Sequence, residues 1–194
     1  LKRKSPLAKV WTLLATERQM VDFRRRLYDQ SLSSTLFNLE FFNFYTLYRR
    51  ILAMAGSRHH RVDEVVRDGL LRHILETLSA AGALPILSPI AGAPGLIRAV
   101  GELIYELKQN LVSPDVMHAA AARMPPKLRE LAAVYRAYQE QLITADIVDR
   151  EGEGWLALDV LHDPDWAGLV SDVDLLVVDG YDQFNVVQAR LLAA

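Results

Sequence analysis

Two short apolar runs near opposite ends of the chain have the pattern of strands in a parallel sheet, and the first fits a buried strand. The first is Val10-Trp-Thr-Leu-Leu-Ala15, and the second is Leu175-Leu-Val-Val178, which is followed directly by Asp179. Strands of parallel sheets are covered on both faces, so they have continuous apolar residues where other strands alternate. We therefore expect residues 10–15 and 174–178 to pair in parallel within one sheet, although most of the chain separates them.

Helix signals follow both runs. Thr16-Glu-Arg-Gln19 is a capping box, in which the Thr hydroxyl and the Gln side chain satisfy free amides at a helix start. A second predicted strand, residues 36–44, leads into a predicted helix over residues 46–55. Asn185 is placed to cap a final helix that begins after it. Strand, turn and helix in this order are typical of an α/β fold with a parallel sheet.

The middle of the chain has a different pattern. From Asp63 to about Asp149 the periodicity is helical, with proline and glycine between the segments. Tyr135 and Tyr138 lie in a leucine stripe with steps of three and four residues, so we predict that they belong to a core and do not stack on bases. The predicted organisation is residues 1–45 as the first α/β part, 46–164 as an all-helical insertion, and 165–194 as the second α/β part.

Composition and charge limit the classes of function. The 194 residues are 51% apolar and 24% charged, which is typical of a globular protein. Residues 1–61 contain 12 Lys and Arg against 4 Asp and Glu, so this third could contact phosphates, or could simply be a solvated surface. There is no cysteine, which excludes disulfides, thiolate zinc sites and iron–sulfur clusters within the chain and is compatible with a reducing cytoplasm.

The chain also has no pattern for a membrane span or a signal peptide. Its longest uncharged stretch, residues 77–97, is interrupted by three prolines. The chain begins at Leu1 and ends within an apolar helical pattern, so we expect it to be a fragment of a longer protein.

Most catalytic motifs are missing. The sequence contains no G-x-x-x-x-G-K-[ST] phosphate loop, no H-E-x-x-H zinc motif and no G-x-S-x-G nucleophile turn. Glu151 and Glu153 alternate with glycines, which indicates a solvated turn and argues against an acid/base pair. We predict no metal site and no cofactor within the chain.

One longer string carries a family resemblance. The segment from Asp174 to Leu192 resembles motif II of UvrD-like superfamily 1 helicases, in which an apolar strand precedes V-D-E-[FY]-Q-D-x-[NT]-x-x-Q. Asp179 matches the magnesium-binding aspartate of that motif. Gly180 stands where the family has its catalytic glutamate, which implies loss of hydrolysis. The other residues of this motif II remnant, as the resemblance implies, are Tyr181, Asp182 and Gln188.

A D-G-[FY]-x-x-F-x-x-x-Q version of the string is similar to the degenerate helicase domain of AddB/RexB, the B subunits of bacterial ATP-dependent helicase-nucleases. Phe184 and Gln188 fit this version. The segment from Asn43 to Leu52 resembles the family's T-F-H-x-L-A-x-x-[IL]-L pattern; Phe44 matches, and Tyr45 replaces the histidine. The residues from Thr12 to Leu27 are similar to the strand and helix that follow the phosphate loop.

The resemblance implies a partial P-loop NTPase (RecA-like) sheet in a cytoplasmic DNA repair and recombination protein. It implies binding of DNA, expected to be single-stranded, and packing against the AddA-type subunit of the helicase-nuclease, without catalysis by this portion. ATP and magnesium would require a phosphate loop upstream of Leu1, and the family's iron–sulfur cluster belongs to a nuclease domain downstream. Candidate DNA contacts are Arg24, Arg25, Phe44 and Tyr45.

Two alternatives stay open at this point. The chain could be the nucleotide-binding half of an active superfamily 1 helicase whose phosphate loop lies outside these residues. It could instead be a helical protein–protein interaction module in which the motif is accidental. Parallel pairing between residues 10–15 and 174–178 distinguishes the helicase-like interpretations from the last one.

Overall fold

The computed structural model describes residues 5–30 and 37–194, which form two compact units. The sheet unit consists of Leu1–Arg58 and Leu156–Ala194, and the helical unit consists of His59–Trp155. Helix α7 (Arg150–His162) contributes residues to both.

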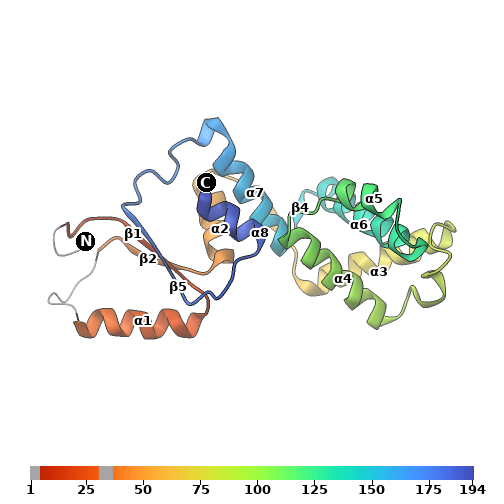
Figure 1. The fold of residues 1–194 in the computed structure, drawn as a ribbon, viewed down its shortest axis with the longest axis horizontal. Coiled ribbons are helices and arrows are strands. Elements are labelled where there is room, and N and C mark those ends of the chain that lie inside the picture. Colours follow the sequence, from red (N-terminus) through yellow and green to blue (C-terminus); the bar gives the residue numbers. More distant parts are fainter. Residues whose placement is uncertain (1–4, 31–36) are drawn as a thin grey trace. The chain divides into compact units, whose positions relative to one another are not determined.

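The sheet unit is built on three parallel strands in the order β2-β1-β5 (Figure 1). Strand β1 (Val10–Leu14) is central and entirely buried, and β5 (Leu175–Asp179) pairs with it in parallel over its whole length. The parallel pairing predicted from the two apolar runs is therefore confirmed. Strand β2 (Leu39–Phe42) pairs with the other side of β1. It falls within the strand predicted over 36–44, of which residue 36 lies outside the described residues. The predicted strand is too long at its end, because Asn43 caps the next helix, which begins at Phe44 and not at residue 46.

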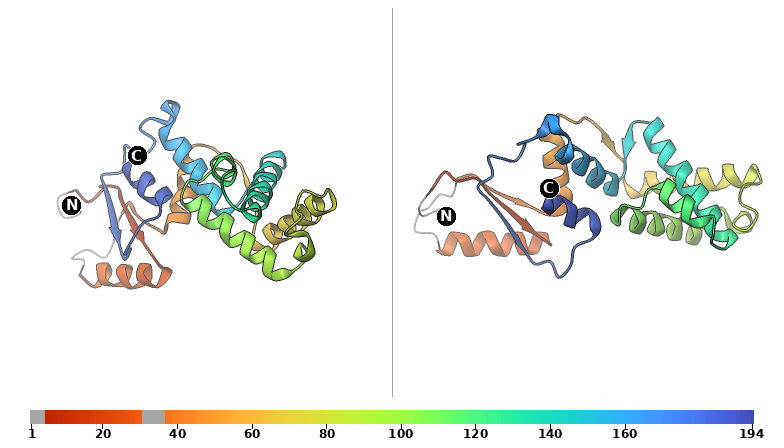
Figure 2. Two further views of the ribbon diagram at one scale, coloured as in Figure 1. Left: turned by 45° about the vertical axis from the view of Figure 1, so that its right-hand side comes forward. Right: turned by 45° about the horizontal axis from the view of Figure 1, so that its top comes forward.

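Helices lie on both faces of this sheet (Figure 2), but the edge strand β5 is less covered than β1, since its Leu175, Leu176 and Val178 side chains are exposed. Phe23 of α1 contacts Phe41 of β2 on one face, and Arg50 of α2 pairs with Glu40 on the other face. Strand side chains alternate between the two faces, so neighbours such as Glu40 and Phe41 contact different helices. The helical elements that belong wholly to this unit are α1 (Glu17–Gln30), α2 (Phe44–Met54), the 3₁₀ turn η2 (Pro164–Trp166) and α8 (Val186–Ala193).

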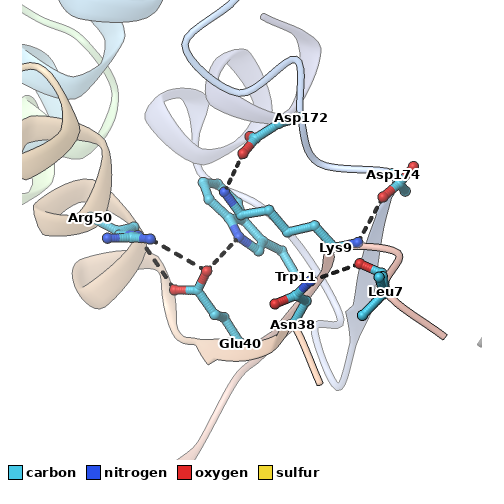
Figure 3. A network of polar contacts seen from close by, with 8 residues as sticks. All are labelled: Leu7, Lys9, Trp11, Asn38, Glu40, Arg50, Asp172 and Asp174. Carbon is cyan, nitrogen blue, oxygen red and sulfur yellow. Dashed lines mark hydrogen bonds and ion pairs between the residues drawn. The ribbon is translucent and has the colours of Figure 1, made fainter. Parts of the chain in front are cut away.

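A polar network ties the amino ends of the three strands together (Figure 3). The Lys9 amide donates to Asp174 ahead of β5 at 2.7 Å, and the Lys9 ammonium lies 2.7 Å from Asp172. On the other side, Asn38 donates to the carbonyl of Leu7 at 2.7 Å. Backbone groups take part in two of these bonds, so the network helps to hold both neighbours of β1 in register at the end opposite to Asp179.

The helical unit has its own apolar core. Its elements, apart from the first residues of α7, are β3 (His60–Arg61), α3 (Glu64–Ala80), the 3₁₀ turn η1 (Ser88–Ile90), α4 (Pro94–Gln109), α5 (Pro114–Ala121), α6 (Pro126–Thr144) and β4 (Ile147–Val148). Tyr135 and Tyr138 of α6 are fully buried in this core, as the leucine stripe predicted. Their hydroxyls donate to the carbonyl of Val112 and the carboxylate of Asp149.

The insertion is not all-helical, which corrects one expectation. Strands β3 and β4 form a parallel two-stranded sheet in which His60 pairs with Ile147 and Arg61 pairs with Val148. Each strand has two residues, which is too short to produce an alternating pattern in the sequence. The pairing brings the start and the end of the helical unit together.

The glutamates expected in a solvated turn are also placed differently. Glu151 and Glu153 lie in the first turns of α7, with 8% and 1% of their surfaces exposed. The glycine between them permits close packing, because a Cβ atom at Gly152 would lie 2.6 Å from Val148 Cγ2 and 2.7 Å from Asp149 Oδ1. The glycines therefore indicate tight contacts inside a helix, and the expected solvated turn is wrong.

Candidate functional site

The candidate site lies where β1 and β5 end. Asp179 is the last residue of β5 and pairs with Leu14, the last residue of β1. In open parallel sheets, ligands bind beyond the carboxyl ends of the strands. The Asp179 side chain is exposed at this edge, so its carboxylate is accessible.

The turn after β1 presents a capped helix start beside Asp179. The Thr16 hydroxyl accepts a hydrogen bond from the Gln19 amide N–H at 3.2 Å, and Gln19 Oε1 accepts from the Thr16 amide at 3.0 Å. These two bonds are the capping box that the sequence predicted. They fix the Gln19 side chain against the turn instead of leaving it free in solvent.

Gly180 lies against that same side chain. Its φ of +79° is in the left-handed region, which glycine adopts without the penalty that a Cβ brings. A Cβ atom at this position would lie 2.5 Å from Gln19 Nε2 and 2.8 Å from Gln19 Cδ and Oε1. The Gln19 amide therefore occupies the space that a larger residue at position 180 would need. Sequence reasoning identified Gly180 and the Thr16–Gln19 turn but missed this contact.

Tyr181 connects the turn after β5 to the end of β1. Its hydroxyl donates to the carbonyl of Leu14 at 2.9 Å. Partial burial raises the pKa of Tyr181 to about 12, so the phenol stays protonated as a donor at neutral pH. The ring packs on Phe44 and Phe184 with centroid distances of 5.1 and 5.5 Å.

The cluster formed by Phe44, Tyr181 and Phe184 has one side in solvent. Phe44 is 2% exposed and forms its buried base, whereas Phe184 is 41% exposed. Tyr45 is partly buried on α2, with its ring 6.0 Å from Tyr48. The accessible ring surface at this edge thus comes from Phe184 more than from Phe44.

The remaining candidates are separate from this edge or have local roles. Gln188 completes a capping box with Asn185 at the start of α8, since Gln188 Oε1 accepts from the Asn185 amide at 3.1 Å. Asp182 is exposed. Arg24 lies over the Phe41 ring at 4.6 Å, and Arg25 is exposed beside Asp29. Because α1 runs back along the sheet from the end of β1, these two arginines lie about two helical turns from the Asp179 edge.

The residues at the edge do not by themselves fit a magnesium nucleotide. Magnesium prefers several oxygen ligands in octahedral geometry. Within residues 5–30 and 37–194, no three His, Asp or Glu side chains are grouped so that they could hold a metal ion. The side chain beside Gly180 is an amide, held by its own capping bonds.

Over residues 5–30 and 37–194, no helix is both long enough and apolar enough to span a membrane.

The fold and this edge define an α/β protein with a parallel sheet and an acidic strand end. The sequence profile of the family described as "ADDB, N-terminal" matches residues 3–194. The chain therefore belongs to the AddB N-terminal family, as the motif II resemblance indicated.

A curated relative agrees with this assignment. The chain is similar to the ATP-dependent helicase/deoxyribonuclease B subunit of Exiguobacterium sibiricum, with 28% identity over 134 residues. The matched region is 68% of this chain and 11% of the relative, so the chain spans only a small part of that protein.

Proposed function

We propose that this chain is a helicase-like, non-catalytic part of the AddB-type subunit of an ATP-dependent DNA helicase/nuclease. It binds single-stranded DNA at the carboxyl ends of its strands and packs against the AddA-type subunit. The complex acts in double-strand-break resection and recombinational repair in the bacterial cytoplasm. Membership of the AddB N-terminal family and the similarity to the B subunit of the Exiguobacterium sibiricum helicase/deoxyribonuclease support the assignment to the AddB-type subunit.

The sheet supports a partial P-loop NTPase fold. Its strands are all parallel, in the order β2-β1-β5, and an aspartate ends β5 next to the capped turn that follows β1. In RecA-like domains an aspartate at such a strand end holds magnesium beside the phosphates. The helical unit, His59–Trp155, is then a mainly helical insertion within this sheet domain, whereas the predicted range 46–164 also includes most of α2, which belongs to the sheet unit.

The contact between Gln19 and Gly180 is the observation that carries the non-catalytic role. Hydrolysis of a nucleotide needs a side chain that orients or activates water beside the magnesium aspartate. At position 180 there is no side chain, and the adjacent space holds the Gln19 amide. A phosphate loop upstream would therefore still lack the acidic partner of Asp179, which disfavours the alternative of an active helicase half. Neither ATP nor an iron–sulfur cluster is proposed for the chain itself.

The aromatic cluster at the strand ends and two exposed arginines of α1, about two helical turns away, support DNA binding. Aromatic rings stack on unpaired bases irrespective of sequence, and cationic side chains bind the phosphates between them. Phe184 offers an exposed ring at the strand ends, Tyr45 lies on α2, and Arg24 and Arg25 offer exposed guanidinium groups on α1. Phe44 is buried and packs against the Phe184 ring, with 5.9 Å between the ring centroids.

Fluorescence anisotropy of a labelled single-stranded oligonucleotide tests the proposal without ATP. We expect micromolar or tighter binding at low salt, with an affinity that falls linearly on a log–log plot against salt concentration. Phe184→Ala should weaken binding about tenfold, since stacking on one base contributes about 1–3 kcal/mol. The double variant Arg24→Ala/Arg25→Ala should reduce the salt slope by about one to two.

Two exposed cations of α6, Lys127 and Arg129, provide the matched control. Their double alanine variant removes the same charge from the helical unit and should leave the affinity and the salt slope nearly unchanged. Absence of binding at low salt by a folded sample would overturn the DNA-binding role and favour packing between subunits alone. An equal loss in both double variants would show non-specific attraction.

A further inference from the structure

Three carboxylates are buried around the start of α7, and two of them have cationic partners. Both carboxylate oxygens of Asp149 accept hydrogen bonds from Lys108 Nζ at 2.7 Å. The Tyr138 hydroxyl and the Gly152 amide also donate to this carboxylate. Glu153 lies 3.4 Å from His59 Nε2 and 3.9 Å from an Arg61 nitrogen. Buried charges are retained in proteins when they are paired in this way.

The third carboxylate, Glu151, is in a different position. Its Oε1 atom is buried and has no hydrogen-bond partner among the described residues. Glu153 Oε2 has no hydrogen-bond partner either, but an Arg61 nitrogen lies 3.9 Å from it. The charged and titratable groups that interact electrostatically with Glu151 are Asp149 and Arg150 from the start of α7, Lys108 from α4 and Tyr138 from α6. Of the two cations, Lys108 is already committed to both oxygens of Asp149.

The neighbours of Glu151 therefore favour its neutral form. Burial is the largest cause, and the Asp149 carboxylate adds like-charge repulsion. A backbone hydrogen bond to the Glu151 carboxylate, Arg150 and Lys108 all lower the pKa of Glu151, but they do not outweigh these two effects. Burial and the Asp149 charge raise the pKa of Glu151 to about 7, against an ordinary value of 4.5.

We propose that Glu151 is a proton-operated latch on the first turn of α7. When protonated, the side chain remains buried beside the Lys108–Asp149 pair and the turn stays packed in the helical unit. When ionised, it places a second buried carboxylate charge next to Asp149, with its Oε1 atom unsatisfied, and the first turn of α7 loosens. The latch is independent of the proposed DNA-binding role, because it lies in the helical unit and uses none of the residues at the strand ends.

The sign of the linkage follows from the raised pKa. Below pH 4.5 the carboxyl is protonated in both the folded and the unfolded chain, and its full contribution is present. Between pH 4.5 and about 7 only the unfolded chain ionises, so stability falls as the pH rises. Above that range the folded state holds the second buried carboxylate charge, and the folding constant is lower by roughly a hundredfold.

Chemical denaturation of the full chain and of Glu151→Gln, at pH 5 and pH 8, tests the latch. The glutamine keeps the shape of the side chain without an ionisable proton. We expect the two proteins to have similar folding constants at pH 5, and the variant to be favoured at pH 8 by roughly a hundredfold. If the ratio of the two folding constants is the same at pH 5 and pH 8, the proposal is overturned.

Glu153→Gln is the matched control, since Glu153 lies two residues away on the same helix and has a cationic partner in Arg61. It should be less stable than the unaltered chain at pH 8, which is the opposite sign. If both variants gain stability at pH 8, general charge repulsion explains the result and the latch is wrong.

A direct titration keeps the proposal testable even if a variant folds poorly. Carboxyl carbon NMR of the unaltered chain, with the Glu151 signal assigned by its loss in Glu151→Gln or by through-bond correlation, should give a midpoint near 7. Hydrogen exchange at the amides of residues 151–155 should accelerate across the same range beyond the intrinsic rate. A midpoint near the ordinary value of glutamate contradicts the latch.

Discussion

Asp179 in the sheet unit and Asp149 in the helical unit occupy similar places in the sequence but have opposite surroundings. Each stands at the carboxyl end of an apolar parallel strand, β5 for Asp179 and β4 for Asp149. Asp149 is 4% exposed and bound by Lys108, Tyr138 and Gly152. Asp179 is exposed, beside a glycine and an amide. An aspartate at a strand end can thus be committed to the fold or available to a ligand, and its neighbours decide which.

Lys108→Met is expected to cause the largest loss of stability among the variants that test this comparison. It leaves the Asp149 charge buried without its cation, and breaking a buried ion pair in this way costs about 3–5 kcal/mol. Urea denaturation measures the loss. The double variant Lys108→Met/Asp149→Asn should recover part of it, because the uncompensated charge is then gone. A loss below about 1 kcal/mol in the single variant would show that Asp149 is not committed to the fold.

Gly180→Glu should be the next largest change. It introduces a Cβ into the space of the Gln19 amide at a φ of +79°, so both a clash and backbone strain follow. We expect a loss of about 1–3 kcal/mol. Adding Gln19→Ala should relieve the clash and leave the strain, so partial recovery is the expected outcome. Unchanged stability of Gly180→Glu would remove the steric basis of the non-catalytic role.

Two helical glycines of the helical unit should respond with opposite signs. Gly152→Ala places a methyl group 2.6 Å from Val148 Cγ2, which should cost about 1–3 kcal/mol through overpacking. Gly69→Ala in α3 meets nothing within 4 Å, so helix propensity should stabilise it by about 0.5–1 kcal/mol. Thermal denaturation of both variants checks the pair. Equal effects would mean that the region around Asp149 is less tightly packed than described.

Asp179→Asn should have the smallest effect. The side chain is exposed, and surface substitutions away from special contacts usually change stability by less than about 0.5 kcal/mol. Denaturation of this variant beside Asp149→Asn gives the contrast between the two aspartates in one experiment. A large loss in Asp179→Asn would show that the strand end is structural and not available to a ligand.

Local signals allowed much of the sheet unit to be predicted from the sequence. The apolar runs predicted the pairing of β1 with β5, and the capping residues Thr16 and Asn185 predicted the helix starts that follow them. These features depend on residues that are close together in the chain or on a strong apolar pattern. The motif II string also led to the family that the sequence profile supports.

The remaining features depend on contacts between distant residues. The burial of Glu151 and Glu153 requires Lys108 and His59, which come from other parts of the chain. The Gln19–Gly180 contact joins two turns that the sheet brings together only after folding. Strands β3 and β4 are too short for a periodic signal. Each of these is a property of packing that local residue patterns do not encode.

Hydrogen exchange of the full chain with and without a single-stranded oligonucleotide tests the central claim most directly. We expect slower amide hydrogen exchange at the strand ends, in residues 14–19, 43–48 and 179–186, and no change in residues 59–155. Protection confined to the helical unit, or no protection at an oligonucleotide concentration well above the expected micromolar dissociation constant, would contradict a DNA-binding role for the sheet edge.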